Sequence, residues 1–114
     1  MIFKIVGRKD WDTAASEGVY RGSADDMRDG FIHFSTAEQL AGTAARHFRG
    51  VTDLVLVAFD DAALGDTLKW EPSRGGQLFP HLYGVLPTKL ALWVRPMPLA
   101  EDGVPRVPED VASC

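Results

Sequence analysis

The chain has 114 residues, of which 46% are hydrophobic, 25% charged and 10% aromatic, a composition typical of one globular domain. The aromatic content and the absence of repeats exclude collagen-like, coiled-coil and disordered chains. The longest apolar run, Leu54 to Phe59, is far shorter than the ~20 residues that span a bilayer. Lys4 and Arg8 interrupt the first segment, so we expect no signal peptide. The single cysteine, Cys114, has no partner for an internal disulfide, and we expect a cytoplasmic protein.

The net charge of −4 is unevenly distributed along the chain. Residues 96–114 carry four acidic residues and one arginine, which leaves a charge of −1 on residues 1–95. The same segment holds four of the seven prolines. We therefore predict one domain over 1–95 and a Pro-rich acidic tail over 96–114, lying along the surface or solvated. A nearly neutral domain lacks a general attraction to nucleic acid, so neither nucleic acid nor a membrane is the expected partner.

The first 30 residues predict a strand, a short helix and a loop. Residues 2–6 are β-branched and aromatic, as in a strand. Asp10 is a candidate N-cap for a short helix over 10–17, which Gly18 would end. Residues 19–30 are rich in Gly, Ser and Asp and favour a loop with at most one helical turn.

A short strand over 31–34 is followed by the main predicted helix, over 36–49. Ser35 and Thr36 are both candidate starts of a capping box, with Glu38 or Gln39 as the partner. The helix places a stripe of apolar residues on one face, which we expect to contact the core. That stripe comprises Ala37, Leu40, Ala41, Ala44 and Phe48.

The remaining segments predict further strands. Residues 53–59 are apolar throughout, as in a strand covered on both faces. Residues 68–71 form a short strand before a proline, and residues 90–94 form a final one. Residues 79–87 fit no single class, because prolines and a glycine interrupt them. The pattern predicts an α+β fold, with a compact, mostly antiparallel mixed sheet, one main helix and one short helix.

The segment Gly30-Phe31-Ile32-His33-Phe34-Ser35-Thr36 is the most informative. Because alternate strand side chains share a face, His33 and Ser35 point together, away from the core. They would then lie just before a helix N-terminus, where free N–H groups favour an anion such as phosphate. The alternative is that His33 is a hydrogen-bonded core residue and that Ser35 only caps the helix.

A second cluster lies in Gln77-Leu78-Phe79-Pro80-His81-Leu82-Tyr83-Gly84. If this segment is extended, Phe79, His81 and Tyr83 share one face, which suits stacking on a nucleobase or nicotinamide ring. The alternative is that the two aromatic rings fill the edge of a sheet while His81 bonds to a backbone carbonyl.

Glu71 is the third candidate. It faces away from Leu68 and Trp70, so it points either to solvent or into a cleft. In a cleft beside Trp70 and Pro72, desolvation would raise the pKa of its carboxyl and suit it to acid–base work. The alternative is an ordinary solvated glutamate.

Other chemistries have little support in the sequence. No HExxH or CxxC spacing accompanies the three histidines, so we expect no metal site. The patterns GxGxxG, GxSxG and the P-loop are absent as well. Cys114 follows a Pro-rich tail that offers no neighbouring base, which makes it a poor nucleophile.

Together these segments resemble a family of small bacterial proteins, domain of unknown function 952. The resemblance spans residues 2–95 and rests on Trp11, GFIHFST, LVLVAFD, LKWE and FPHLYGVLP. This family has been grouped, on distant similarity, with the ADP-ribosyltransferases. The grouping implies a split β-sheet that holds NAD in a cleft.

That grouping implies a His or Arg on one strand, a Tyr or Ser on another and a catalytic Glu on a third. His33 with Ser35 resembles the first element, Tyr83 the stacking aromatic residue and Glu71 the acid, although their order and spacing differ from the superfamily pattern. Many relatives have a histidine in the first strand where this chain has Lys4.

The leading hypothesis is a cleft that binds NAD or a related nucleotide as its substrate, with ADP-ribosyl transfer or NAD glycohydrolysis as the reaction. His33, Glu71 and His81 are the candidate catalytic residues. Ligand binding is assigned to Ser35, Thr36, Phe79 and Tyr83. The alternative is a non-catalytic module of the same fold that binds a small anion or a peptide, and a third hypothesis is a metal-dependent hydrolase.

Overall fold

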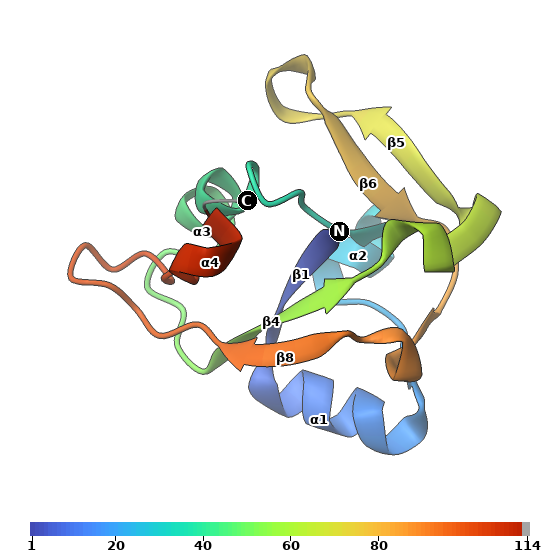
Figure 1. Cartoon of the computed structure of the whole chain (residues 1–114), viewed down its shortest axis with the longest axis horizontal. Helices are drawn as coiled ribbons and strands as arrows, with labels where there is room; N and C mark the ends of the chain where they lie inside the picture. The colour runs from blue at the N-terminus through green and yellow to red at the C-terminus, as the bar shows by residue number, and fades with distance from the viewer. Residues whose placement is uncertain (113–114) are drawn as a thin grey trace.

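Three small antiparallel sheets and four α-helices make up the computed structural model, which describes residues 1–112 (Figure 1). The predicted α+β class is confirmed. The first sheet has the order β1-β4-β8, the second the order β3-β6-β5, and β2 pairs with β7. The strands are β1 (Ile2–Gly7), β2 (Val19–Tyr20), β3 (Ile32–His33), β4 (Leu54–Phe59), β5 (Leu68–Pro72), β6 (Leu78–Leu82), β7 (Leu86–Pro87) and β8 (Trp93–Pro96). The α-helices are α1 (Arg8–Glu17), α2 (Ala24–Asp29), α3 (Leu40–His47) and α4 (Glu109–Ala112), and 3-10 turns cover Asp61–Thr67, Arg74–Gly76 and Thr88–Leu90. None of the helices within residues 1–112 is long and apolar enough to cross a bilayer.

Strands β1 and β4 divide the core into two apolar clusters. Their residues alternate between the two faces, as the period of a strand requires. On one face, Ile2 and Val6 pack with Trp11 of α1 and with the strands of the second sheet. On the other face, Phe3 and Ile5 pack with α3 and with the C-terminal segment. All six residues of β4 are buried, as its unbroken apolar sequence predicts.

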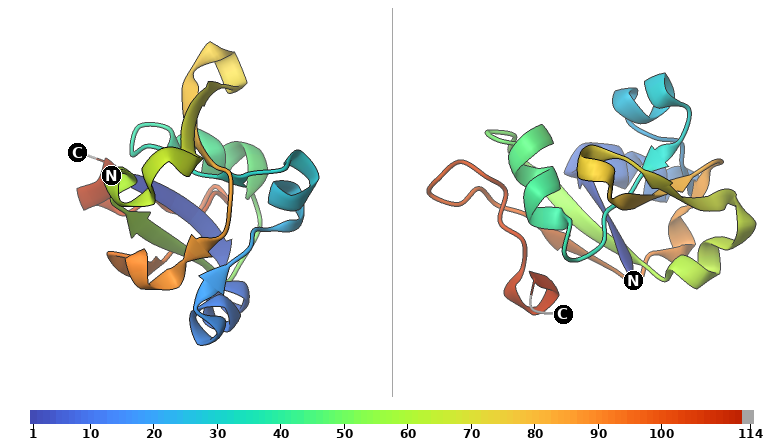
Figure 2. Two further views of the ribbon diagram at one scale, coloured as in Figure 1. Left: turned by 90° about the vertical axis from the view of Figure 1, so that its right-hand side faces the viewer. Right: turned by 90° about the horizontal axis from the view of Figure 1, so that it is seen from above.

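A short segment joins the two three-stranded sheets. Phe3 and Ser35 exchange backbone hydrogen bonds of 2.8 and 2.9 Å, and the Phe34 N–H donates to the carbonyl of Pro80 at 3.0 Å. Beyond this junction, the hairpin of β5 and β6 projects away from the rest of the molecule (Figure 2). Residues 34–35 therefore connect β1 of the first sheet to β6 of the second.

The predicted helix boundaries need two corrections. Helix α1 begins at Arg8 with Gly7 as its N-cap, so Asp10 lies in the first turn and does not cap, although Gly18 ends the helix with φ +89° as expected. The predicted main helix begins at Leu40 rather than at residue 36, which makes α1 the longer helix. Thr36 and Gln39 do exchange the hydrogen bonds of a capping box, but they close a turn before the helix.

Two other segments also differ from the sequence prediction. Residues 24–29 form a true helix that begins with a capping box between Ser23 and Asp26, where a loop was the expectation. The last strand of the sheet covers Trp93–Pro96 instead of 90–94, because residues 88–90 form a 3-10 turn.

The segment after Arg95 packs on the domain as far as the structure describes it. Met97 and Val111 are both buried in the cluster that contains α3, and α4 is held by two hydrogen bonds between Arg95 and Asp110 of 2.6 and 2.8 Å. The apolar residues among the prolines and acids explain this contact. Cys114 lies outside the described residues.

Leu40→Ala should lower the free energy of unfolding by about 2–5 kcal/mol, because Leu40 is fully buried and its truncation leaves a cavity. The control is Leu92→Ala, since Leu92 is 54% exposed and its truncation should change stability by less than about 0.5 kcal/mol. Urea denaturation of both variants checks this. Equal losses would contradict the packing described for α3.

Candidate functional site

A cavity of about 420 Å³ opens where the two sheets diverge. Its walls come from β1, α2, the segment 33–35, α3 and β6. The lining combines aromatic rings, three histidines and five charged residues. They include Phe3, Lys4, Asp25, Asp26, Arg28, Asp29, His33, Ser35, His47, Phe79 and His81.

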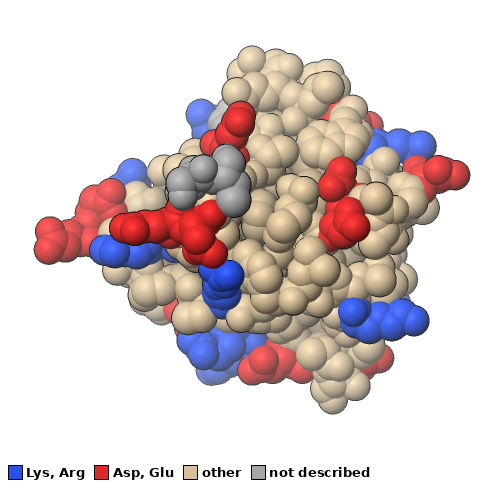
Figure 3. Space-filling model, in the orientation of Figure 1, with Lys and Arg blue, Asp and Glu red and all other residues tan. Residues whose placement is uncertain are grey.

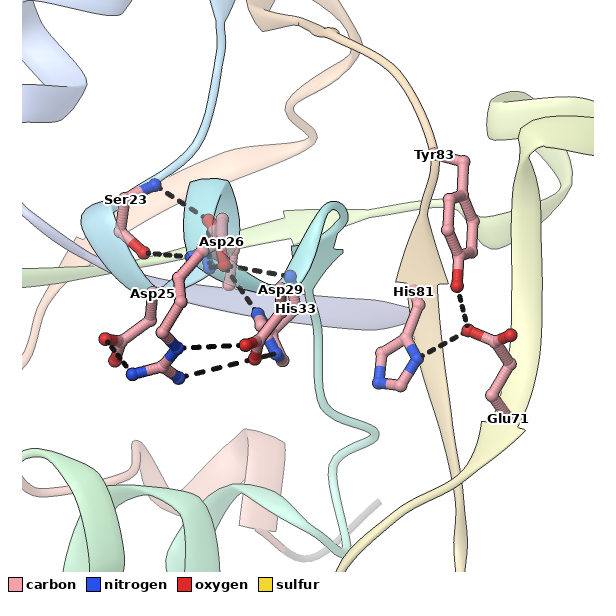
Figure 4. Close-up of polar contacts among 10 residues, drawn as sticks. Ser23, Asp25, Asp26, Asp29, His33, Glu71, His81 and Tyr83 are labelled. Atoms are coloured by element: carbon pink, nitrogen blue, oxygen red, sulfur yellow. Dashed lines mark hydrogen bonds and ion pairs between the residues drawn. The ribbon is translucent and has the colours of Figure 1, made fainter.

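A buried carboxylate, that of Asp26, ties three elements together at this cavity. Its two oxygens lie 3.1 and 3.0 Å from the ammonium of Lys4 on β1. The backbone N–H of Ser23 donates to one oxygen at 2.8 Å and closes the capping box of α2. The backbone N–H of His33 donates to the other oxygen at 3.1 Å, so a side chain takes the place of a neighbouring strand as acceptor. Figure 4 shows the contacts of Asp26 with Ser23 and His33.

The carboxylate of Asp26 is held in its charged form. Burial alone would raise its pKa, but the hydrogen bond from His33 and the charge of Lys4 outweigh burial and hold the pKa well below its usual range. Burial also lowers the pKa of Lys4, and the charge of Asp26 opposes that shift without cancelling it. Lys4 and Asp26 are each less than a tenth exposed, so each charge depends on the other.

The chain leaves no space beside this carboxylate for a larger residue at position 22. Gly22 has φ +114°, a conformation that favours glycine, and a Cβ there would lie 2.8 Å from the Cβ of Asp26. Gly22 therefore lets the backbone pass close over Asp26 as it enters α2.

His33 sits between two carboxylates. Its Nδ1 lies 2.7 Å from Asp26, and its Nε2 lies 2.9 Å from Asp29. Carboxylates thus occupy both ring nitrogens of His33, which leaves neither nitrogen to contact a ligand in the cavity.

His81 is held differently, although it lies directly opposite His33 in the register of β3 and β6. The two ring centroids are 5.5 Å apart. The Nδ1 of His81 lies 2.8 Å from Glu71, and its other ring nitrogen is directed away from Glu71, toward the side of His33 (Figure 4). Phe31 stacks on the ring of His81 with a centroid distance of 4.0 Å. This ring, which is 4% exposed, therefore presents a second nitrogen in the wall of the cavity.

Four of the predicted site residues line the cavity, namely His33, Ser35, Phe79 and His81. Glu71 and Tyr83 do not line it. They lie behind His81, where Glu71 contacts the imidazole and accepts a hydrogen bond of 2.8 Å from the Tyr83 hydroxyl.

The anion site expected at Ser35 and Thr36 is wrong in its geometry. The helix begins four residues later, and three N–H groups of this segment are already bonded. The N–H of Ser35 donates to Phe3, that of Thr36 to the side chain of Gln39, and that of Gln39 to Thr36. The Ser35 hydroxyl contacts Thr43 of α3 at 2.9 Å.

Sequence reasoning missed Lys4 and Asp26 as site residues. Lys4 occupies the same face of β1 as the buried residues Ile2 and Val6. A single lysine at an inward position of an apolar strand was therefore the sequence signal of a buried, paired charge. For Asp26, the signal was the spacing of a capping box, Ser23-x-x-Asp26.

Among the residues that the structure describes, no three His, Cys, Asp or Glu side chains converge as ligands of a metal ion would. On the face shown in Figure 3, Asp and Glu side chains gather at the left, next to Lys and Arg, and uncharged residues cover most of the middle.

The buried pair predicts a strong energetic coupling between Lys4 and Asp26. In a double-mutant cycle of Lys4→Met and Asp26→Asn, we expect Asp26→Asn alone to cost about 3–5 kcal/mol, because it leaves a buried ammonium without its carboxylate. The double variant should be more stable than the sum of the single losses predicts, by about 1.5–3 kcal/mol. Urea denaturation at pH 7 measures all four proteins.

The matched control is the pair of Arg8 and Asp53, which is also short, at 2.7 Å, but about half exposed. The same cycle there should give a coupling below about 1 kcal/mol. Equal coupling energies for the two pairs would contradict the role given to Asp26.

The stability of the protein should also depend on pH through Asp26. Between the lowered pKa of Asp26 in the folded state and about 4, its pKa in the unfolded state, the folded protein binds fewer protons than the unfolded chain. The free energy of unfolding should therefore fall as the pH drops through that window, which urea denaturation at a series of pH values measures.

Comparison with known proteins assigns the chain to a family. The chain is similar to solved structures of protein CC0527 from Caulobacter crescentus. Its crystal structure is 47% identical over 97% of both chains, with a TM-score of 0.94. Its solution NMR structure is 48% identical over 92% of this chain and 90% of that one, with a TM-score of 0.83. No curated protein gives a significant match. A family model described as protein of unknown function (DUF952) matches residues 5–94, and the chain therefore belongs to that family, as its motifs predict.

Proposed function

We propose that the cavity binds the nicotinamide–ribose part of NAD, or a related ADP-ribosyl nucleotide, and that the bond between nicotinamide and ribose is broken there. The observation that carries this proposal is the pair of histidines. His33 and His81 face each other in one cavity, yet both nitrogens of His33 contact carboxylates while His81 presents its second nitrogen to the cavity.

The size and lining of the cavity support a ligand of this class. A volume of about 420 Å³ is within the range of small-molecule sites. The rings of Phe3 and Phe79 offer apolar surface for a flat heterocycle. The carboxylates of Asp25 and Asp29 suit the hydroxyl groups of a ribose and the positive charge of a nicotinamide ring. Arg28 pairs with Asp25 and Asp29 at the same place, and its exposed guanidinium has the charge to contact a phosphate.

The chemistry assigned to the cavity is a displacement at C1′ of the ribose. The C1′–N bond breaks, and its electron pair leaves with nicotinamide, which becomes neutral. The oxygen of a water molecule bonds to C1′, and its proton passes to the Nε2 of His81. The products are ADP-ribose and nicotinamide. A positioned base of this kind contributes about 10²- to 10⁴-fold to a rate.

His33 has a different task in this proposal. Both of its nitrogens contact carboxylates, so neither is open to take a proton from the ligand. Asp26, which holds this ring, also binds the ammonium of Lys4. The ring of His33 is therefore fixed in the wall of the cavity, where it limits the positions that the ribose can take.

Millimolar NAD or ADP-ribose should raise the melting temperature, and glutathione should not, because a ligand that binds only the folded state stabilises it by mass action. Glutathione lacks both the heterocycle and the ribose. Release of nicotinamide from NAD, measured by chromatography, should fall by about 10²- to 10⁴-fold in His81→Asn. Differential scanning fluorimetry gives the first readout.

The control variant is Arg8→Gln, which lies beyond the far end of β1, outside the cavity lining, and should leave both readouts unchanged. Stabilisation without any release of nicotinamide would contradict the reaction and leave a non-catalytic binding module. The absence of a shift with either nucleotide would overturn the proposal as a whole.

A further inference from the structure

We infer that Glu71 and Tyr83 are positioning residues that act through His81, fixing the proton of its neutral ring on Nδ1 so that Nε2 faces the cavity as a lone pair. The inference rests on the proposed function for its catalytic meaning. Its structural content concerns only the ring of His81, which can be observed without any ligand.

The first contact in this arrangement joins β5 to β6. Glu71 lies opposite Phe79 in the register of these strands, so it is a diagonal neighbour of His81. Its Oε1 is 2.8 Å from the Nδ1 of the imidazole. A carboxylate only accepts, and the Nδ1 of a ring bonded to it must therefore carry the proton. In the neutral ring, Nε2 is then the unprotonated nitrogen.

The second contact holds the carboxylate itself. The Tyr83 hydroxyl donates to the same Oε1 of Glu71, also at 2.8 Å. Two donors on one oxygen restrict the rotation of the carboxylate and keep that oxygen toward the imidazole. The hydrogen bond from His81, followed by that from Tyr83, holds the pKa of Glu71 below its usual value, so the carboxylate stays charged.

The third contact fixes the plane of the His81 ring but does not determine which of its two nitrogens faces the cavity. Phe31 stacks on His81 with an interplanar angle of 25° and also contacts the rings of Tyr83 and His33. A ring turned over by 180° would stack equally well. The hydrogen bond to Glu71 is therefore the contact that decides which nitrogen faces the cavity.

The residues that orient His81 are more exposed than His81 itself. His81 is 4% exposed, whereas Tyr83 is 41% exposed and the Glu71 side chain 38%. The chain of contacts from His81 through Glu71 to Tyr83 thus runs from the buried cavity wall to the surface. Substitution of Glu71 or Tyr83 removes neither a large buried group nor a lining side chain, so these variants should fold.

Nitrogen-15 NMR of the histidine rings tests the inference directly, at a pH where His81 is neutral. In the unaltered protein, Nδ1 should be protonated and Nε2 unprotonated. In Glu71→Ala the ring should populate both tautomers, and in Tyr83→Phe it should move in the same direction by a smaller amount. His33 serves as an internal control, because its partners Asp26 and Asp29 are untouched. The matched control is Trp70→Phe, on the opposite face of β5, which should leave both rings unchanged.

Turnover supplies the second readout. Glu71→Ala should lower kcat for nicotinamide release by about 10- to 100-fold with little change in KM, as expected of a residue that orients a catalytic group. A proton on Nε2 in the unaltered protein, or an unchanged tautomer in Glu71→Ala, would overturn the inference even if NAD is cleaved. The expected tautomers in a protein that does not bind NAD would support the arrangement of Glu71, Tyr83 and His81 and overturn only the proposed reaction.

Discussion

The carboxylate of Asp26 is the constraint on which the rest of the site depends. Strand β1 pairs with the segment after β3 at Phe3 and Ser35, whereas β3 itself has a neighbouring strand, β6, on one edge and none on the other. Asp26 fills this gap by accepting from Ser23, Lys4 and His33 at once. The same carboxylate begins helix α2, neutralises a buried lysine and orients an imidazole. The cavity exists because the two strands diverge here, and they diverge without leaving buried groups unpaired because Asp26 lies between them.

Lys4 is a charged residue on an otherwise apolar face of β1. Its neighbours on the same face of β1, Ile2 and Val6, belong to the apolar core. A lysine there would be costly if its charge were unpaired, and replacing such a pair by apolar residues often stabilises a protein. Lys4 and Asp26 thus interrupt the apolar pattern of this face in the wall of the cavity, where the proposed ligand would bind.

Local pattern was sufficient for much of the fold. The apolar strand Leu54–Phe59, the strand that begins at Leu68 and the helix end at Gly18 follow from residues that are adjacent in the sequence. Alternation along each strand correctly placed His33 and His81 on the face away from the core of their own strands. Their pairing in the register of β3 and β6 then puts both rings on one surface.

The remaining features depend on contacts between distant segments. Thr36 and Gln39 satisfy each other in a turn, which delays the helix to Leu40, and no local signal distinguishes this from a helix start. The burial of Val111 requires the surface of α3, which propensity does not describe. The position of Glu71 behind His81, rather than in the cavity, depends on the diagonal pairing of β5 with β6.

Amide NMR of the protein titrated with ADP-ribose tests the central claim most directly, since it reports where a ligand binds without requiring turnover. The account predicts saturable shifts at Lys4, Asp26, His33 and His81, with little change around Arg8 and Asp53 at the other end of β1. Shifts confined to that distant end, or no shifts at millimolar ligand, would contradict the assignment of the cavity between the two sheets as a nucleotide site.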